Sequence, residues 1–242
     1  MQVHLVAAGK YHDIDFARLE LLKLLAEIPE IRTTVAIDYG DLERLVDCSL
    51  LITYTCDVVP TDEQVAGLTS FLERGGRWLA LHGTNSVIQF DKDGAITPDI
   101  APDFMKLLGT RFVGHPPIEP FKVRISRDHP LTAGMRDFST LDELYLSERI
   151  ADVDVLMHSR FEGGACPDFA EADQAAQDVP ILYLRQVGEG AILYCTLGHC
   201  RGHYDLRPLS NFWPHPQRCS WDYPEFAEIL RRGIRWGFDR QI

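Results

Sequence analysis

The stretch from Arg77 to Asn85, Arg-Trp-Leu-Ala-Leu-His-Gly-Thr-Asn, decides the fold class of this chain. Residues 78–81 are all apolar, which predicts a strand buried on both faces of a parallel sheet. This strand delivers His82 and Gly83 to the carboxyl edge of the sheet, where open α/β sheets bind their ligands. A polar residue followed by Gly at a strand end also predicts the tight turn of a nucleophile elbow.

The sequence around this strand has the alternation of an α/β protein. In the first third, β-rich runs at residues 3–8, 33–37 and 50–54 alternate with amphipathic stretches at 15–28 and 61–74. In the second half, strand-like runs at 121–125, 153–157, 181–184 and 191–195 are joined partly by hairpins, and a closing helix is expected over 225–238. We therefore expect one domain over residues 1–242, with a layered sheet that is mostly parallel with added antiparallel strands.

Composition narrows the class of protein. The chain has 242 residues, 45% of them hydrophobic, and a formal net charge of -12. An anionic protein is a poor partner for nucleic acid or anionic lipid. No apolar run approaches the length of a membrane span, and the first residues lack the pattern of a secretion signal. The sequence therefore predicts a cytoplasmic protein.

The six cysteines show no close-paired spacing, at positions 48, 56, 166, 195, 200 and 219. This pattern favours reduced thiols over a disulfide framework or a zinc ribbon. The elbow position holds His82 where acyl transfer needs Ser or Cys, so nucleophilic amide chemistry is disfavoured.

Four polar residues are the candidate catalytic groups. The run at residues 191–198 delivers His199 as residues 78–81 deliver His82, His115 precedes two prolines in a restricted loop, and Glu143 lies in an otherwise apolar segment. Imidazole and carboxylate can act as acid and base near neutral pH, or bind a divalent ion such as zinc or manganese. The alternatives are a metal-free acid–base pair, hydrogen-bond partners for a sugar, and hydrogen-bonded structural histidines.

The remaining candidates concern ligand binding. We expect Asn85, His203, Trp213 and Trp221 to contact substrate. The long aromatic loop at residues 204–223 is typical of a pocket cover, although an ordered flap or a subunit contact would explain it equally well. Residues 163–178 are predicted to be a solvated surface excursion, and His12 a loop residue near the sheet edge. A homo-oligomer is a further expectation.

Six segments together resemble the trehalose-utilisation (ThuA-like) family. They are Gly-Gly-Arg-Trp-Leu-Ala-Leu-His-Gly (75–83), Leu-Gly-Thr-Arg-Phe-Val-Gly-His (108–115), Asp-His-Pro-Leu-Thr-Ala-Gly-Met (128–135), Asp-Glu-Leu-Tyr (142–145), Tyr-Cys-Thr-Leu-Gly-His (194–199) and Arg-Gly-Ile-Arg-Trp (232–236). Each segment is short, but their order and spacing extend the resemblance over nearly the whole chain.

The resemblance implies a flavodoxin-like fold similar to that of the class I glutamine amidotransferases, without amidotransferase activity. That activity needs a cysteine at the elbow and His-x-Glu near the end, whereas this chain has His82 and His199-Cys200-Arg201. The resemblance further implies a sugar substrate, with acid–base chemistry on a 3-keto disaccharide made by a partner oxidoreductase. The alternative function is a non-catalytic sugar-binding or regulatory module.

Overall fold

The structure is a computed structural model that describes residues 1–92, 94–170 and 173–239. The main sheet contains nine strands: β1 (Gln2–Gly9), β2 (Arg32–Ala36), β3 (Leu50–Cys56), β4 (Arg77–Leu81), β8 (Glu119–Ile125), β9 (Phe138–Asp142), β11 (Asp154–Phe161), β14 (Gln177–Val187) and β15 (Gly190–Cys195). Three two-stranded sheets pair β5 (Gln89–Asp91) with β6 (Gly94–Ile96), β7 (Thr110–Gly114) with β10 (Leu146–Arg149), and β12 (Gly164–Ala165) with β13 (Asp173–Gln174).

The α-helices within the described residues are α1 (Ile14–Ala26), α2 (Asp62–Glu73), α3 (Pro102–Leu108) and α4 (Pro224–Trp236). Short 3₁₀ turns occupy Leu42–Leu45, His82–Asn85 and Cys219–Asp222. The start of α2 shows why a helix forms there. Thr61 accepts a hydrogen bond from the Gln64 backbone, and the Gln64 side chain returns one to the Thr61 backbone, so a capping box satisfies two free donors of the first turn.

The strands of the main sheet follow the order β2-β1-β3-β4-β15-β14-β11-β8-β9. The first five strands in this order are mutually parallel, and every neighbouring pair from β15 onward is antiparallel. Both halves of the chain therefore contribute to one sheet, and the predicted mixed α/β fold is confirmed. Leu81 of β4 lies opposite Cys195 of β15, so these two strands end at the same level.

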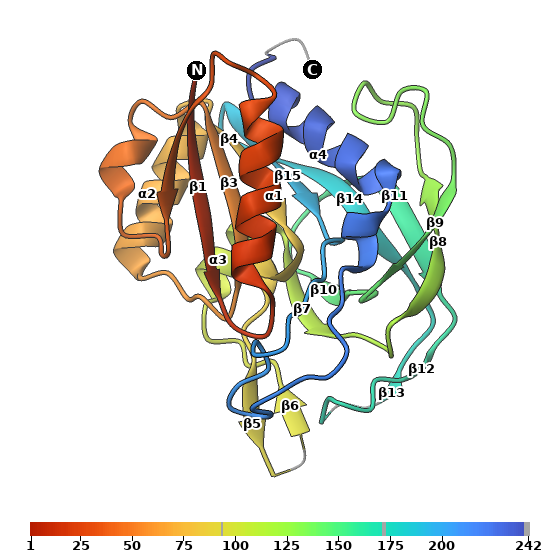
Figure 1. The fold of residues 1–242 in the computed structure, drawn as a ribbon. Coiled ribbons are helices and arrows are strands. Elements are labelled where there is room, and N and C mark those ends of the chain that lie inside the picture. Colours follow the sequence, from red (N-terminus) through yellow and green to blue (C-terminus); the bar gives the residue numbers. More distant parts are fainter. Residues whose placement is uncertain (93, 171–172, 240–242) are drawn as a thin grey trace.

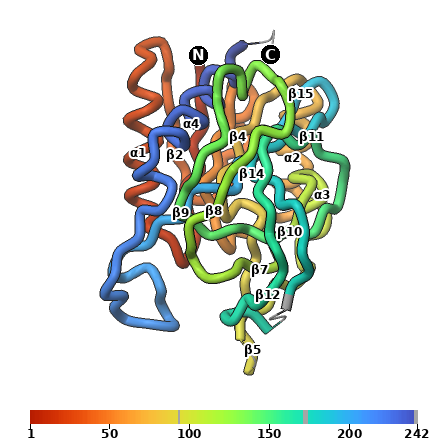
Figure 2. The backbone as a smooth tube through the Cα atoms, turned by 90° about the vertical axis from the view of Figure 1, so that its right-hand side faces the viewer, coloured from red at the N-terminus to blue at the C-terminus, as the bar shows by residue number. Residues whose placement is uncertain are grey.

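The helices cover the two faces of the sheet. Figure 2 shows α1 and α4 on one side of the strands and α2 and α3 on the other. Buried residues of α1 and α4 belong to one apolar cluster, and those of α2 and α3 to a second. Because β3 and β4 are covered on both faces, their residues are almost all buried, as the apolar run at residues 78–81 predicts.

Several loops and two of the small sheets lie together at one end of the molecule. The small sheets β5–β6 and β12–β13 and the long segment before α4 lie at the end opposite the two termini (Figure 1). The carboxyl ends of β1, β3 and β4 point to this end, where the prediction places a ligand. None of the helices in the described ranges is both long and apolar enough to cross a membrane.

Candidate functional site

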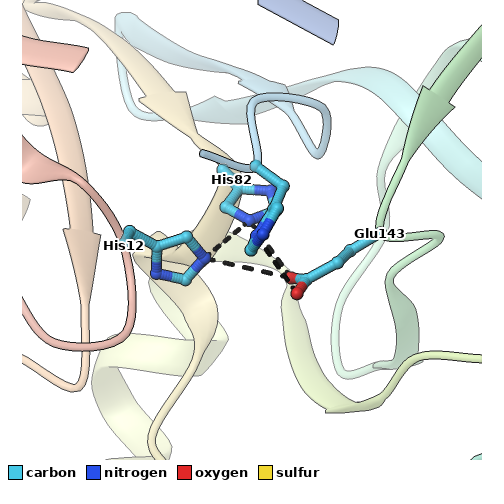
Figure 3. A group of neighbouring side chains, drawn as sticks. His12, His82 and Glu143 are labelled. Carbon is cyan, nitrogen blue, oxygen red and sulfur yellow. Dashed lines mark hydrogen bonds and ion pairs between the residues drawn. The ribbon is translucent and has the colours of Figure 1, made fainter. Parts of the chain in front are cut away.

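Four buried side chains converge at the loop end of the sheet: His12, His82, Glu143 and His199. His82 and Glu143 directly follow β4 and β9, while His12 and His199 lie in the loops after β1 and β15. One ligand atom from each side chain lies within 4.8 Å of the other three. Figure 3 shows His12, His82 and Glu143 directed toward a common point. We call these four residues the histidine cluster.

The turn after β4 positions His82. Its backbone has a positive φ of 44°, the strained conformation of an elbow. The Tyr194 hydroxyl donates a 2.6 Å hydrogen bond to the His82 carbonyl and thereby holds the turn. A Cβ atom on Gly83 would lie 2.7 Å from the Thr55 carbonyl oxygen, so only glycine allows the backbone to approach β3 this closely.

Asp142 brings Glu143 and His199 together across the sheet. The Asp142 carboxylate accepts hydrogen bonds from the backbone N–H groups of Glu143 (2.8 Å), Gly198 (2.9 Å) and His199 (3.1 Å). It also accepts a longer one from Ser220 at the end of the aromatic loop. One buried carboxylate therefore fixes three segments that are far apart in the sequence.

Backbone carbonyls determine the tautomers of His12 and His82. The Nδ1 atom of His12 lies 3.0 Å from the Lys10 carbonyl oxygen, and that of His82 lies 2.8 Å from the Thr196 carbonyl oxygen. A carbonyl oxygen only accepts, so each Nδ1 donates, and each Nε2 of a neutral ring carries a lone pair. These two Nε2 atoms face each other at 2.9 Å.

His199 has the opposite tautomer, but it too directs a nitrogen lone pair into the cluster. Its Nε2 donates to Gln217 Oε1 at 2.8 Å, and Arg201 donates to the same oxygen at 3.3 Å, which supports this orientation of the amide. The Nδ1 atom of His199 is therefore the lone-pair atom. It is buried without a hydrogen-bond partner and faces Glu143 Oε1 at 3.1 Å.

Burial and neighbouring charges determine the protonation states of His12 and Glu143. Burial lowers the pKa of His12 to about 3, which makes this ring neutral at pH 7. Burial alone would raise the pKa of Glu143, but the neighbouring His115 and His199 hold it well below its usual range. Glu143 is therefore a buried carboxylate.

A pocket of about 570 Å³ opens onto the cluster. It is lined by Tyr11, His12, Ile88, Phe90, Gly94, Ala95, Phe112, His115, Pro117, Ile118, Glu143, Tyr145, Asp168, Phe169, Arg201, Leu206, Leu209, Trp213 and Gln217. We call this the aromatic pocket. Its size is typical of small-molecule sites, as is its mainly apolar wall with a few convergent polar groups.

His115 is the histidine on the pocket wall nearest to Glu143. Its Nδ1 donates to the Pro116 carbonyl at 2.8 Å, so its Nε2 carries the lone pair. This Nε2 lies 3.4 Å from Glu143 Oε1, and the ring packs against Tyr145 and Phe169. His115 is thus positioned to exchange a proton with a molecule in the pocket.

The structure brings together the four predicted catalytic residues, but not all in equal roles. His115 and Glu143 line the aromatic pocket, whereas His82 and His199 have no exposed surface and lie behind it. The cluster also differs from the predicted metal set, because His12 takes the place of His115 in it. Trp213 lines the pocket, and its contact with substrate stays a prediction.

Three of the predicted substrate-binding residues lie outside the pocket lining. Asn85 is fully buried, and its amide donates to Thr110 inside the fold. His203 stacks on Phe212. Trp221 packs against Phe16 of α1 and Phe226 of α4 and donates to the Gly198 carbonyl at 2.8 Å. The side chains of these residues are engaged in packing and internal hydrogen bonds, and their contact with substrate stays a prediction.

Two further segments contribute to the pocket wall, one of them against expectation. The segment at 163–178 is not only a surface excursion, because Cys166 and Phe169 are buried and Phe169 forms part of the pocket wall; residues 171–172 lie outside the described part. The loop at 204–223 does contribute Leu206, Leu209, Trp213 and Gln217 to the pocket.

His12 is the site residue that sequence reasoning undervalued. The signal was present, since residues 3–8 form a predicted strand and Gly9 ends it just before His12. The same argument that selects His82, a polar group beyond a strand's carboxyl end, also applies to His12.

The cysteines do not offer a nucleophile. All six lie outside any disulfide, and burial raises the pKa of Cys56 well above its ordinary value and that of Cys200 to about 12. A buried thiol of this kind stays protonated and unreactive. The site therefore has the chemistry of imidazole and carboxylate groups in an elbow-type α/β fold.

Comparison with known proteins agrees with this fold class. A ThuA-like protein of Bacteroides uniformis ATCC 8492 is 17% identical and superposes with a TM-score of 0.64, covering 100% of this chain and 93% of that one. A ThuA-like protein of Parabacteroides merdae ATCC 43184 gives 13% identity and a TM-score of 0.64, with coverage of 98% and 89%. The cytoplasmic protein STM1381 of Salmonella typhimurium LT2 gives 13% identity and a TM-score of 0.53, with coverage of 98% and 97%.

The sequence itself identifies the family. The family model described as ThuA, trehalose utilisation, matches residues 5–211. The chain therefore belongs to the ThuA family, which connects it with carbohydrate metabolism. No curated protein matched the sequence.

Proposed function

We propose that this protein is an enzyme that acts on a disaccharide or related sugar carrying a ketone group. The reaction uses acid–base chemistry in the aromatic pocket. The observation that carries the proposal is the position of His115. Its Nε2 lone pair lies on the pocket wall, 3.4 Å from the carboxylate of Glu143. The family description supports a sugar as the substrate.

The reaction needs one group that both takes and returns a proton. A ketone at C3 of a sugar acidifies the neighbouring C2–H bond. His115 removes that proton, and the electron pair of the C–H bond forms an enolate. When the ketone re-forms, a C1–C2 double bond appears and the C1–O glycosidic bond breaks. The protonated His115 then returns its proton to the departing oxygen. Return of the proton to a ring carbon instead gives isomerisation.

The neighbours of His115 suit this role. The buried carboxylate of Glu143 favours the protonated ring that follows proton transfer. Arg201 lies 3.6 Å from Glu143 Oε1 and also lines the pocket, where its positive charge would stabilise an enolate oxygen. His82 and His199 have no exposed surface, so we assign the proton transfer to His115 and not to them.

The pocket wall fits a sugar. Six aromatic side chains, Tyr11, Phe90, Phe112, Tyr145, Phe169 and Trp213, contribute to it. Aromatic faces pack against the C–H faces of sugar rings, while Asp168, Arg201 and Gln217 supply hydrogen-bond partners for hydroxyl groups. One relative of similar fold is described as cytoplasmic, and we place this reaction in the cytoplasm as well.

The test compares an oxidised sugar with its parent. Purified protein is incubated with trehalose and with 3-keto-trehalose, and products are followed by NMR. We expect conversion of the keto sugar only, with release of one hexose or appearance of an isomer. His115→Gln should lower kcat by about 100-fold or more, which is the usual share of a general acid–base group.

The control is His158→Gln, because His158 is bonded to Ser126 at the surface, outside the pocket lining. It should retain wild-type turnover. Binding of both sugars without conversion of either would contradict the enzymatic proposal and support the sugar-binding module instead. Unchanged turnover in a folded His115→Gln variant would remove His115 from the mechanism.

A further inference from the structure

The histidine cluster presents four lone-pair atoms to one another, and no donor of its own lies between them. The tautomers leave lone pairs on His12 Nε2, His82 Nε2 and His199 Nδ1. The fourth member is the Glu143 carboxylate. The contacts of 2.9 Å between the His12 and His82 rings and 3.1 Å between His199 and Glu143 are repulsive unless positive charge lies between the atoms.

The cluster is compact and shielded from water. The ring of His199 lies 5.1 Å from that of His12 and 5.7 Å from that of His82, and all three are buried. One divalent ion at the centre of the cluster would place positive charge between both pairs of atoms and contact all four side chains.

We propose that His12, His82, His199 and Glu143 form a binding site for a divalent transition metal ion. This inference deepens the proposed function, because it assigns a cofactor to the same pocket. The donor set of three imidazoles and one carboxylate is typical of zinc and related ions. Bonds of about 2.0–2.1 Å in a tetrahedron place ligand atoms about 3.3 Å apart. Within the cluster the His12 and His82 rings are 2.9 Å apart, His199 lies 3.1 Å from Oε1 of Glu143, and His82 and His12 lie 3.5 and 3.9 Å from its Oε2. All four ligand atoms lie within 4.8 Å of one another, close enough for one ion to draw them together.

The surroundings of the cluster also match a metal site. Metal-binding histidines usually donate their second ring N–H to a carbonyl, a carboxylate or a similar acceptor, which fixes the tautomer and the ring orientation. Here His12 donates to Lys10, His82 to Thr196 and His199 to Gln217. The second nitrogen of each ring is therefore already occupied, and the first is left free for the ion.

The site has access from one side. His12 and Glu143 belong both to the cluster and to the lining of the aromatic pocket, whereas His82 and His199 are buried behind them. An ion bound here would lie at the pocket floor and could accept an oxygen atom of a bound molecule. His115 approaches Glu143 from the pocket side, and we therefore leave it outside the ligand set.

The experiment measures metal binding directly. The full chain is stripped with a chelator, and its folding is checked by circular dichroism. Zn²⁺, Mn²⁺ and Mg²⁺ are then titrated in competition with a chromophoric chelator. We expect one Zn²⁺ per chain, weaker binding of Mn²⁺ and no binding of Mg²⁺, following the softness and number of nitrogen ligands. Co²⁺ in place of Zn²⁺ should give the visible absorption of a tetrahedral site.

Single substitutions distinguish the proposed metal ligands from the neighbouring His115. His12→Gln and His199→Gln should each lower Zn²⁺ affinity by 100-fold or more, whereas His115→Gln should retain it within about threefold. Absence of Zn²⁺ binding by the folded wild-type chain would overturn the inference. So would a loss of affinity in His115→Gln without one in His12→Gln. Metal binding is scored without any sugar, so its outcome stands apart from that of the turnover test.

Discussion

His199 and Gln217 are joined by a 2.8 Å hydrogen bond that links the site to the loop at 204–223, which contributes to the pocket wall. Gln217 also pairs its backbone with that of Arg201, in both directions, at 2.8 and 3.0 Å. The orientation of the His199 ring is therefore set by a residue of the loop at 204–223. Because the same oxygen of Gln217 also accepts from Arg201, the loop positions two groups of the site at once.

Gln217→Leu tests this link. Leucine keeps the bulk of the side chain but cannot accept the N–H of His199, so the ring is no longer fixed in the tautomer that presents Nδ1 to the cluster. We expect Zn²⁺ affinity to fall by about 10-fold to 100-fold, the usual effect of removing such a partner. Chelator competition measures it. Gln2→Leu, an exposed position at the start of β1, is the control and should bind as wild type. Equal affinities in the two variants would contradict the link.

Trp213 and Trp221, both in the loop at 204–223, should have different roles. Trp213 lines the aromatic pocket, and its buried Nε1 has no hydrogen-bond partner. Trp213→Ala should raise KM for the keto sugar by about 10-fold, through loss of an aromatic contact, with little change in unfolding. Trp221→Ala should instead destabilise the fold by about 3 kcal/mol, because Trp221 packs on Phe226 and bonds to Gly198. Chemical denaturation and steady-state kinetics on both variants check the assignment, which a reversed pattern would refute.

Asp142 should be essential for stability. Asp142→Asn keeps the size of the side chain but removes its charge and directs an N–H group toward a backbone N–H. We expect a loss of about 3 kcal/mol in the free energy of unfolding, since hydrogen bonds to a buried charge contribute about 1.5–3 kcal/mol each. Urea denaturation measures it. Asp178→Asn, at an exposed ion pair with Arg160, should change stability by less than about 0.5 kcal/mol. A loss at Asp142 no larger than this would show that the three segments hold together without it.

Gly9 is required at the turn that leads to His12. Its φ is 117°, and an added Cβ would lie 1.9 Å from the Cys56 carbonyl oxygen. Gly9→Ala must therefore displace the backbone before His12, and we expect a loss of about 3 kcal/mol together with weakened Zn²⁺ binding. Gly134→Ala is a matched control, with φ of 73° and open space around the new Cβ. It should cost only about 1 kcal/mol and leave the metal affinity unchanged. Similar losses in both would mean that backbone conformation, and not contact with Cys56, decides the outcome.

The parts of the site that could be predicted are those attached directly to strongly patterned strands. Glu143 directly follows a strand, β9, but the sequence pattern predicts no strand at 138–142 and marks Glu143 only as a carboxylate in an apolar segment. His82, in contrast, follows the predicted strand at 78–81 without an intervening residue. The period of the strands and the rule for sheet edges are sufficient to place such residues. The α/β fold could be predicted for the same reason.

Residues in loops could not be placed in this way. His12 is three residues beyond β1, and its direction depends on the positive φ of Gly9 and on the bond from Arg201 to the Tyr11 carbonyl. The sequence does not distinguish Trp213 from Trp221, because the path of the loop at 204–223 decides which ring reaches the pocket. Phe169 enters the pocket from a segment whose polar composition predicts a surface position. In each case contacts distant in sequence outweigh the local pattern.

The ligands of the histidine cluster come from the ends of β1, β4, β9 and β15, which include both the parallel and the antiparallel part of the sheet. An ion bound by all four ligands would link regions that separate on unfolding, and it would therefore stabilise the folded state. At a free concentration about 1,000 times its Kd, such an ion adds about 4 kcal/mol to the folded state. The amount of this protein that survives proteolysis in a cell would then rise and fall with the supply of the metal, even when synthesis stays constant.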